Sequence, residues 1–274
     1  MNENTSEQPT IAYLPSAWKP RQCDDLVRLG SKHDGGYIVT ENIIRHTDLL
    51  VGLGVGIDWT FEEDFHKRKD IPVHCYDHTI SLSQFVKYAI RDVKLFIRTP
   101  SIINFRRLHM PNILLPLKYK SFFSGNRKHF KEKIGDDPGC YTDLRKIFSR
   151  IPGGDKVFIK IDIEGWEYRT LYGLKDYYER LTGLTVEFHH LTTMMDTVDS
   201  HINDLSKSFN IVHVHANNYG GTDERGIPTT IEMTFESKQH SPGRNAPSER
   251  TYPVDGLDFP NLAHQTDYNL EFRD

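Results

Sequence analysis

Short apolar runs that alternate with amphipathic stretches are the dominant pattern along the chain. The runs are enriched in β-branched and aromatic residues and stop at Gly, Asp, His or Asn, which is typical of buried strands. They lie at residues 48–54, 71–77, 156–162, 183–189 and 210–216. Stretches with helical periodicity lie at residues 143–151, 166–181 and 197–209. This alternation predicts an α/β fold in which a mostly parallel sheet is covered by helices on both faces.

The remaining segments modify this picture. Residues 229–236 have a strand pattern with no helix before them, which predicts an antiparallel strand at the edge of the sheet. A basic stretch after the second strand predicts a cap insertion at about residues 80–128, within a single domain of residues 26–274. We expect residues 1–25 to be flexible, and residues 237–274, which are rich in Pro and Asn, to form an ordered irregular tail.

Composition narrows the class of protein. With 274 residues, 37% hydrophobic and 26% charged, the chain can bury a full core and is neither disordered nor fibrous in composition. The first ten residues do not resemble a signal peptide and no apolar run is long enough to cross a bilayer, so we expect a cytoplasmic protein. Cys23, Cys75 and Cys140 are widely spaced, which predicts reduced thiols instead of disulfides or a zinc site.

The net charge of −4 hides an uneven distribution. Residues 94–133 contain ten Lys and Arg against one acid, Glu132. The ten are Lys94, Arg98, Arg106, Arg107, Lys118, Lys120, Arg127, Lys128, Lys131 and Lys133. This stretch suits a phosphate or an anionic surface, with a solvated face as the alternative. Aromatic residues are interleaved, but no nucleic-acid-binding signature accompanies them, so we expect no nucleic acid partner.

Three glycines follow the first strong strand, where an open α/β sheet binds nucleotides. Gly52, Gly54 and Gly56 would let the backbone approach a ligand closely, although a tight turn without a ligand is the alternative. A dinucleotide fingerprint would place a small residue where Ile57 stands, so the spacing favours S-adenosylmethionine over NAD. Asp77, at the end of the next strand, is placed to accept hydrogen bonds from ribose hydroxyls.

Acids and imidazoles gather at the ends of the later strands. Asp162 and Glu164 would lie close together, where a cation, a proton or hydrogen bonds must offset their repulsion; capping of the next helix is the alternative. Glu187, with Asp162 and His215, is a tentative Mg²⁺ or Mn²⁺ ligand set. Attack by a hydroxyl on a methyl group needs a base or a metal, and the candidate bases are Asp162, His189 and His190. We expect Lys160 to pair with a carboxylate.

Several of these segments together resemble the FkbM-type methyltransferases, including the branch with an N-terminal D-G-G-Y segment. The resembling segments are "LGSKHDGGYIV" (29–39), "GLGVGIDWTFEEDF" (52–65), "FKEKIG" (130–135), "KIDIEGWE" (160–167), "VEFHHL" (186–191), "HVHANNYGG" (213–221) and "DGLDFPN" (255–261). The resemblance implies a Rossmann-like class I fold, a third strand at 130–135, and S-adenosylmethionine-dependent O-methylation of sugars, polysaccharides or natural products.

The resemblance also assigns roles to individual residues. The three glycines and Asp77 would hold the cofactor, and Asp162 with Glu164 would lie at the reaction centre. Many relatives have a G-A-N-x-G loop and an acid beside it; this chain lacks both, and Glu62 or Glu63 would replace the acid. Asp34 and Tyr37 would face the cofactor or acceptor across the D-G-G-Y turn, with a simple hairpin turn as the alternative.

The sequence therefore predicts an O-methyltransferase that acts on a sugar hydroxyl of a nucleotide sugar or surface glycan, with the basic cap holding a phosphate. Two other classes remain open. A metal-dependent phosphoester hydrolase could use Asp162, Glu187 and the histidines, and a non-catalytic glycan-assembly subunit could bind a partner through the basic segment. A homo-oligomer is compatible with either reading.

Overall fold

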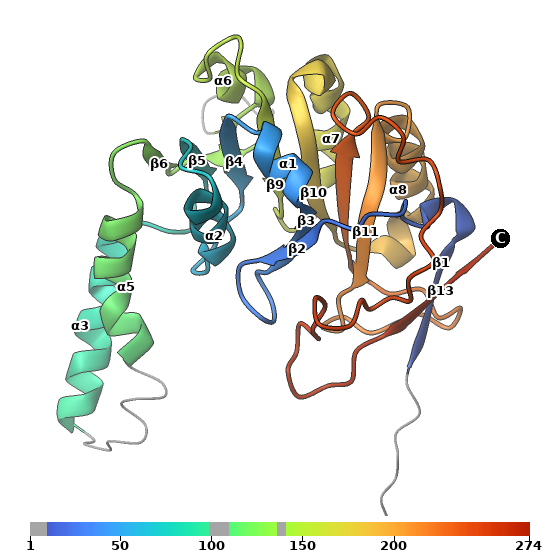
Figure 1. The fold of residues 1–274 in the computed structure, drawn as a ribbon. Coiled ribbons are helices and arrows are strands. Elements are labelled where there is room, and N and C mark those ends of the chain that lie inside the picture. Colours follow the sequence, from blue (N-terminus) through green and yellow to red (C-terminus); the bar gives the residue numbers. More distant parts are fainter. Residues whose placement is uncertain (1–9, 99–109, 136–140) are drawn as a thin grey trace, which may run out of the picture.

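A seven-stranded sheet forms the centre of the computed structural model, which describes residues 10–98, 110–135 and 141–274. Its strands are β4 (Leu49–Leu53), β5 (Val73–Tyr76), β6 (Arg127–Phe130), β9 (Val157–Ile161), β10 (Leu181–Phe188), β11 (Phe209–Ala216) and β12 (Ile231–Ser237). They lie in the order β11-β12-β10-β9-β4-β5-β6, and β12 runs antiparallel to both neighbours. This is the strand order of the Rossmann-like class I methyltransferase fold, as predicted (Figure 1).

Helices cover both faces of this sheet. Successive residues of each strand point to opposite faces, so one strand contributes side chains to two cores. Leu50 of β4 packs in one core with α1 (Glu41–His46) and α2 (Thr60–Arg68). Val51, the next residue, packs in the other core with α6 (Leu144–Ser149), α7 (Glu167–Leu174) and α8 (Leu191–Leu205). The two-sided burial explains why β4 and β9 read as continuous apolar runs.

Most predicted elements are present, with shifted ends. The expected helix at 166–181 is α7 followed by a 3-10 helix at Lys175–Arg180, and the one expected at 197–209 begins earlier, with α8. The expected third strand at 130–135 is instead β6, which ends at Phe130. Lys133–Ile134 form β7, which pairs with β8 (Tyr141–Thr142) outside the main sheet.

The antiparallel strand was predicted at the edge of the sheet, and this position is wrong. β12 lies between β10 and β11, and β11 is at the edge. The chain reverses after β11 and enters the gap beside β10, so β12 is paired on both sides and fully buried. Periodicity reveals a strand but not its neighbours.

The segment expected to form a cap contains two helices that pack as a hairpin. Along the chain, α3 (Leu82–Arg98) and α5 (Met110–Phe122) follow β5 and precede β6, and in space they project away from the sheet (Figure 1). Residues 99–109, with Arg106 and Arg107, lie outside the described residues. None of the described helices is both long and apolar enough to span a bilayer.

The two ends of the described chain meet in a small sheet. β1 (Ile11–Pro15) pairs in parallel with β13 (Asn269–Arg273), and Leu14 and Trp18 are buried. The expectation of a flexible segment therefore does not fit residues 10–25, because their apolar side chains pack against the end of the chain; residues 1–9 lie outside the described part. Residues 238–268 between β12 and β13 are irregular, and β2 (Leu26–Leu29) forms a hairpin with β3 (Tyr37–Thr40).

The cysteines are consistent with the predicted reduced thiols as far as they are described. Cys23 and Cys75 are free and buried. Burial raises the pKa of both thiols above their usual value, which keeps them protonated at neutral pH. Cys140 lies outside the described residues.

Candidate functional site

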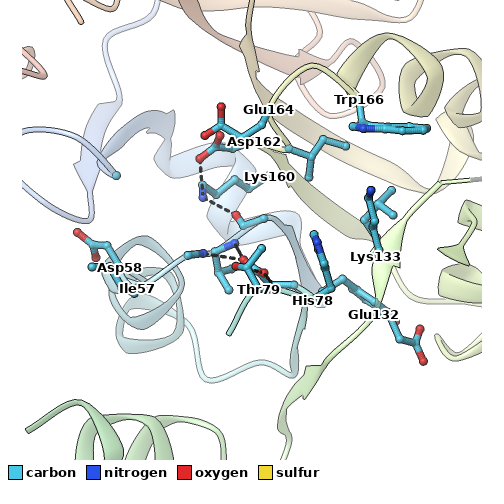
Figure 2. A pocket seen from close by; sticks show the side chains of 18 of the residues that line it. Ile57, Asp58, His78, Thr79, Glu132, Lys133, Lys160, Asp162, Glu164 and Trp166 are labelled. Atoms are coloured by element: carbon cyan, nitrogen blue, oxygen red, sulfur yellow. Dashed lines mark hydrogen bonds and ion pairs between the residues drawn. The ribbon is translucent and has the colours of Figure 1, made fainter. Parts of the chain in front are cut away.

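A pocket of about 580 Å³ opens at the carboxyl ends of β4, β5 and β9 (Figure 2). The loops after these strands contribute residues 54–58, 77–79 and part of 162–166 to its lining. Asp34 and Gly35 of the β2–β3 turn and residues 132–134 complete it. Figure 2 shows Lys160, Asp162 and Glu164 on one side and His78 and Lys133 on another.

Two of the three predicted cofactor glycines line this pocket. Gly54 has φ +74°, and a Cβ there would lie 1.7 Å from the carbonyl oxygen of Asp162, so only glycine fits. Gly56 also has a positive φ. Gly52 does not line the pocket; it lies inside β4, where a Cβ would meet the buried carboxylate of Glu62. Its small size makes room for that side chain.

Asp77 lines the pocket and braces the glycine loop. Its Oδ2 accepts hydrogen bonds from the backbone N–H groups of Val55 (3.1 Å) and Gly56 (2.8 Å), and its Oδ1 accepts from Thr79. Burial alone would raise the pKa of Asp77, but these hydrogen bonds outweigh it and lower the pKa below its usual value. Its predicted bonds to ribose remain a prediction.

Lys160 is buried beneath the pocket and neutralises part of its acidity. Its Nζ donates to the carbonyl oxygen of Gly54 at 3.0 Å and lies 3.5 Å from Oδ2 of Asp162, which confirms the predicted carboxylate pairing. Burial would lower the pKa of Lys160, but the charges of Glu62, Asp162 and Glu187 outweigh it and raise the pKa above its usual value. Lys160 is therefore a fixed cation and not a base.

Tyr37 does not face the pocket as predicted, because its ring is buried beside Lys160. Its hydroxyl lies 3.1 Å from Oδ2 of Asp162 and 2.9 Å from Oε2 of Glu187, and it can donate to only one of them at a time. Glu187 also accepts from the side-chain amide of Asn217. Tyr37 thus positions the two carboxylates, which the sequence pattern did not reveal.

His189 lies among carboxylates. Its Nδ1 is 3.0 Å from Oε1 of Glu167, and its Nε2 is 3.6 Å from Glu164 and 3.8 Å from Glu187. Burial would lower the pKa of His189, but the hydrogen bond with Glu167 and the charges of Glu187 and Asp162 outweigh it and raise the pKa to about 9. In this arrangement the imidazole is a cation at neutral pH, so the base role predicted for it does not fit.

Glu167 is a functional candidate that sequence reasoning missed. It is fully buried, and its Oε1 accepts from the backbone N–H groups of Ile163 and Gly165 as well as facing His189. It therefore fixes both the loop that carries Glu164 and the ring of His189. The signal was available, because an acid in the first turn of a helix often bonds free N–H groups.

Among the described residues, the non-glycine residues with positive φ are Glu164 (53°), which lines the pocket, and His190 (58°). Such backbone angles cost about 1–3 kcal/mol each and cluster at functional sites. The side chain of Glu164 is largely exposed in the pocket. His190 precedes α8 and does not line the pocket, although its ring lies 6.4 Å from that of His189.

The predicted metal ligands do not come together. His215 bonds Asp267 and lies near Glu232, in a separate buried cluster. Pairing places Glu187 opposite Glu232 and Glu232 opposite His215, so two strand spacings, about 10 Å, separate Glu187 from His215. In the described part of the chain, Asp162, Glu164 and His189 bring ligand atoms within 4.8 Å of one another instead.

The acid expected beside the glycine loop is also elsewhere. Glu63 accepts from the indole of Trp59 and does not line the pocket. Glu62 is fully buried, and burial raises its pKa to about 7. Beside the glycine loop, the pocket is lined by Asp34 and Asp58 instead. Asp34 was predicted to face this site, whereas Asp58 was missed although it precedes a helix. Burial and the charge of Asp162 raise the pKa of Asp34.

Of the described basic residues in 94–133, Lys133 lines the pocket. Its Nζ lies 5.5 Å from the ring centre of Trp166, which lines the same wall. The α3–α5 hairpin contributes no residue to the lining, so the predicted phosphate grip by the cap has no counterpart in the pocket among the described residues.

Comparisons with known proteins bear on the fold alone. No protein-family model and no curated protein matches the chain. Solved structures match at low similarity. The fibrillarin pre-rRNA processing protein of Methanococcus jannaschii has 10% identity and a TM-score of 0.37 over 71% of this chain and 68% of its own. A Streptococcus thermophilus rRNA methylase has 9% identity and a TM-score of 0.38 over 72% of this chain and 92% of its own. Precorrin-6y C5,15-methyltransferase of Geobacter metallireducens has 12% identity and a TM-score of 0.37 over 71% of this chain and 83% of its own. The fold assignment rests on the strand order.

Proposed function

We propose that this protein is an S-adenosylmethionine-dependent methyltransferase that methylates a hydroxyl oxygen. The observation that carries the proposal is the meeting of two sets of residues around one pocket: the Gly54–Gly56 loop with Asp77, and Asp162 with Glu164. His189 lies beside the second set without lining the pocket. They meet where open α/β sheets bind nucleotides, at the carboxyl ends of the strands.

The pocket suits the cofactor in size and chemistry. Its volume of about 580 Å³ lies within the range of small-molecule sites. Gly54 and Gly56 offer backbone without side chains. The carboxylate of Asp77 already accepts four hydrogen bonds, so a ribose hydroxyl would take the place of the Thr79 hydroxyl at Oδ1. Asp34 and Asp58 are anions that would bind the amino group of the cofactor. This last pairing replaces the one expected for Glu62 or Glu63.

Bound S-adenosylmethionine supplies an electrophilic methyl carbon. With the cofactor bound, the acceptor oxygen would bond to this carbon as the carbon–sulfur bond breaks, and the sulfur would keep the electron pair. The hydroxyl proton would pass to Asp162 or Glu164, whose carboxylates line the pocket. Tyr37 and Lys160 hold Asp162 in position, so the chain contributes alignment and a proton acceptor.

Asp162, Glu164 and, once its proton is displaced, Nε2 of His189 would also hold Mg²⁺ or Mn²⁺, which would acidify the acceptor hydroxyl. Glu167 bonds the other ring nitrogen of His189, as carboxylates commonly do behind a metal-bound histidine. Mn²⁺ binding, followed by paramagnetic resonance, should weaken about tenfold or more in Asp162→Asn. Asp58→Asn, in the same pocket but outside the cluster, should bind Mn²⁺ like the wild type. Equal affinity in all three proteins would contradict the metal site.

We further propose an acceptor of the sugar class, as in the FkbM-type enzymes that the chain resembles. Trp166 offers a flat apolar face and Lys133 a cation on one wall of the pocket, which suits a sugar that carries a phosphate, such as a nucleotide sugar or a surface-glycan precursor.

Calorimetry with S-adenosylhomocysteine, together with a turnover assay on a panel of nucleotide sugars, tests the function. The wild type should bind and turn over. Gly54→Ala should abolish detectable binding, because the added methyl group meets Asp162 and φ is positive. Gly153→Ala is the matched control, since a Cβ there meets nothing within 4 Å. A wild type that fails to bind the cofactor product but cleaves phosphoesters with Mn²⁺ would instead support the hydrolase, which the acidic cluster also favours.

A further inference from the structure

The α3–α5 hairpin carries an apolar stripe that the described structure leaves exposed. Val86, Ile90, Val93 and Ile97 follow one another at intervals of four, three and four residues, so they lie on one face of α3. Between 41% and 71% of each of these residues is accessible to solvent. On α5, Leu114 and Leu117 are exposed one turn apart.

A basic stripe runs beside this apolar stripe. Lys87, Arg91, Lys94 and Arg98 repeat the same intervals one residue later, which places them about 100° further round the helix. α5 adds Lys118 and Lys120. Asp92 is the one acid of these two helices as described, and it is buried and bonded to Arg91 and Asn112. The described part of the hairpin therefore exposes positive charge only.

The base of the hairpin is already packed, so the exposed stripe is not a missing part of the core. Phe85, Tyr119 and Phe123 lie with their ring centres 5.5–6.1 Å from that of Trp59, in the loop after β4. These contacts anchor the helices to the domain. The stripe on α3 begins at Val86, one residue after Phe85, so it lies about 100° round the helix from the packed face.

We propose that the hairpin docks on the surface of an anionic phospholipid bilayer. An amphipathic helix with apolar residues on one face and Lys or Arg next to them lies in the interface, with the apolar side chains among the acyl chains. Each Lys or Arg near such a surface adds attraction to the lipid headgroups. The docked hairpin would hold the domain and its pocket beside the membrane without a spanning helix.

Charge and side-chain type argue against other occupants. Two copies of the hairpin packed face to face would bring like charges together, which repels. Single-stranded nucleic acid stacks its bases on aromatic rings, whereas the exposed stripe is aliphatic.

Vesicle co-sedimentation of the full chain tests the proposal. The wild type should sediment with vesicles of phosphatidylcholine mixed with phosphatidylserine and stay in solution with phosphatidylcholine alone. Lys87→Gln with Lys94→Gln should weaken binding about 30-fold, because two cations are lost. Ile90→Ser with Ile97→Ser should weaken it about tenfold or more. Tyr219→Ser, at an exposed residue outside the hairpin, should bind like the wild type.

Thermal melting of each variant checks that the fold is retained, which we expect because all the changed side chains are exposed. The proposal would be overturned if the wild type bound both kinds of vesicle equally well, or if it did not sediment with either. A dimer in solution that Ile90→Ser with Ile97→Ser dissociates, without vesicle binding, would assign the stripe to a second copy and would equally overturn it.

Discussion

Asp77 illustrates how a residue can be placed correctly while its contacts stay hidden in the sequence. Its position at the end of a strand predicted a place beside the glycine loop, and it lines the pocket there. The pattern could not show that its oxygens also accept bonds from Val55 and Gly56, since those contacts depend on how the loop after β4 folds back. The carboxylate therefore shapes the loop before any ligand arrives.

Glu62 gives a residue-scale prediction about pH. Burial raises its folded pKa from the usual 4.5 to about 7, so between these values the folded state binds more protons than the unfolded state. Stability from this group is therefore present below about pH 4.5 and falls as pH rises towards 7. The change amounts to at most about 3 kcal/mol. Urea unfolding at several pH values should show a shallower loss over this range in Glu62→Gln.

Glu63→Gln is the matched control for this prediction. Its side chain is only partly buried and can still accept from Trp59 after the change. Its pH profile of stability should follow that of the wild type. If Glu62→Gln also follows the wild type, the carboxyl of Glu62 does not titrate in the folded state as described.

At the scale of elements, the insertion of β12 decides which histidine belongs to the site. Had β11 lain directly beside β10, His215 would have been close to Glu187. Because β12 separates them, His215 is bonded to Asp267, and His189, directly after β10, faces the acids instead. Both histidines occur at the ends of apolar runs, so the sequence could not distinguish them.

The pairing of β1 with β13 gives a prediction at the same scale. Leu14 is 1% exposed, whereas Ile11 in the same strand is 39% exposed. Leu14→Ala should lower the free energy of unfolding by about 2–5 kcal/mol, because it leaves a cavity in the core. Ile11→Ala should cost well under half of that. Chemical denaturation measures both, and equal small effects would mean that this segment does not contribute to the folded domain.

At the scale of the whole molecule, the pocket lies where the strand order reverses. The chain runs from β4 outward to β5 and β6, and then returns to β9 on the other side of β4. The connections leave β4 and β9 towards opposite faces, so a crevice opens between their ends. The pocket therefore arises from the topology, and its loops determine which ligand it suits.

Local pattern was enough to predict the α/β class, six strands of the sheet and the residues 54, 56, 77, 162 and 164 of the pocket. Burial on two faces leaves apolar runs, and parallel strands collect their carboxyl ends at one edge, so both are readable along the chain. The partners of Tyr37, Glu167 and His189, and the place of β12, were decided only by the tertiary structure. They depend on contacts between segments far apart in the chain, which periodicity does not encode.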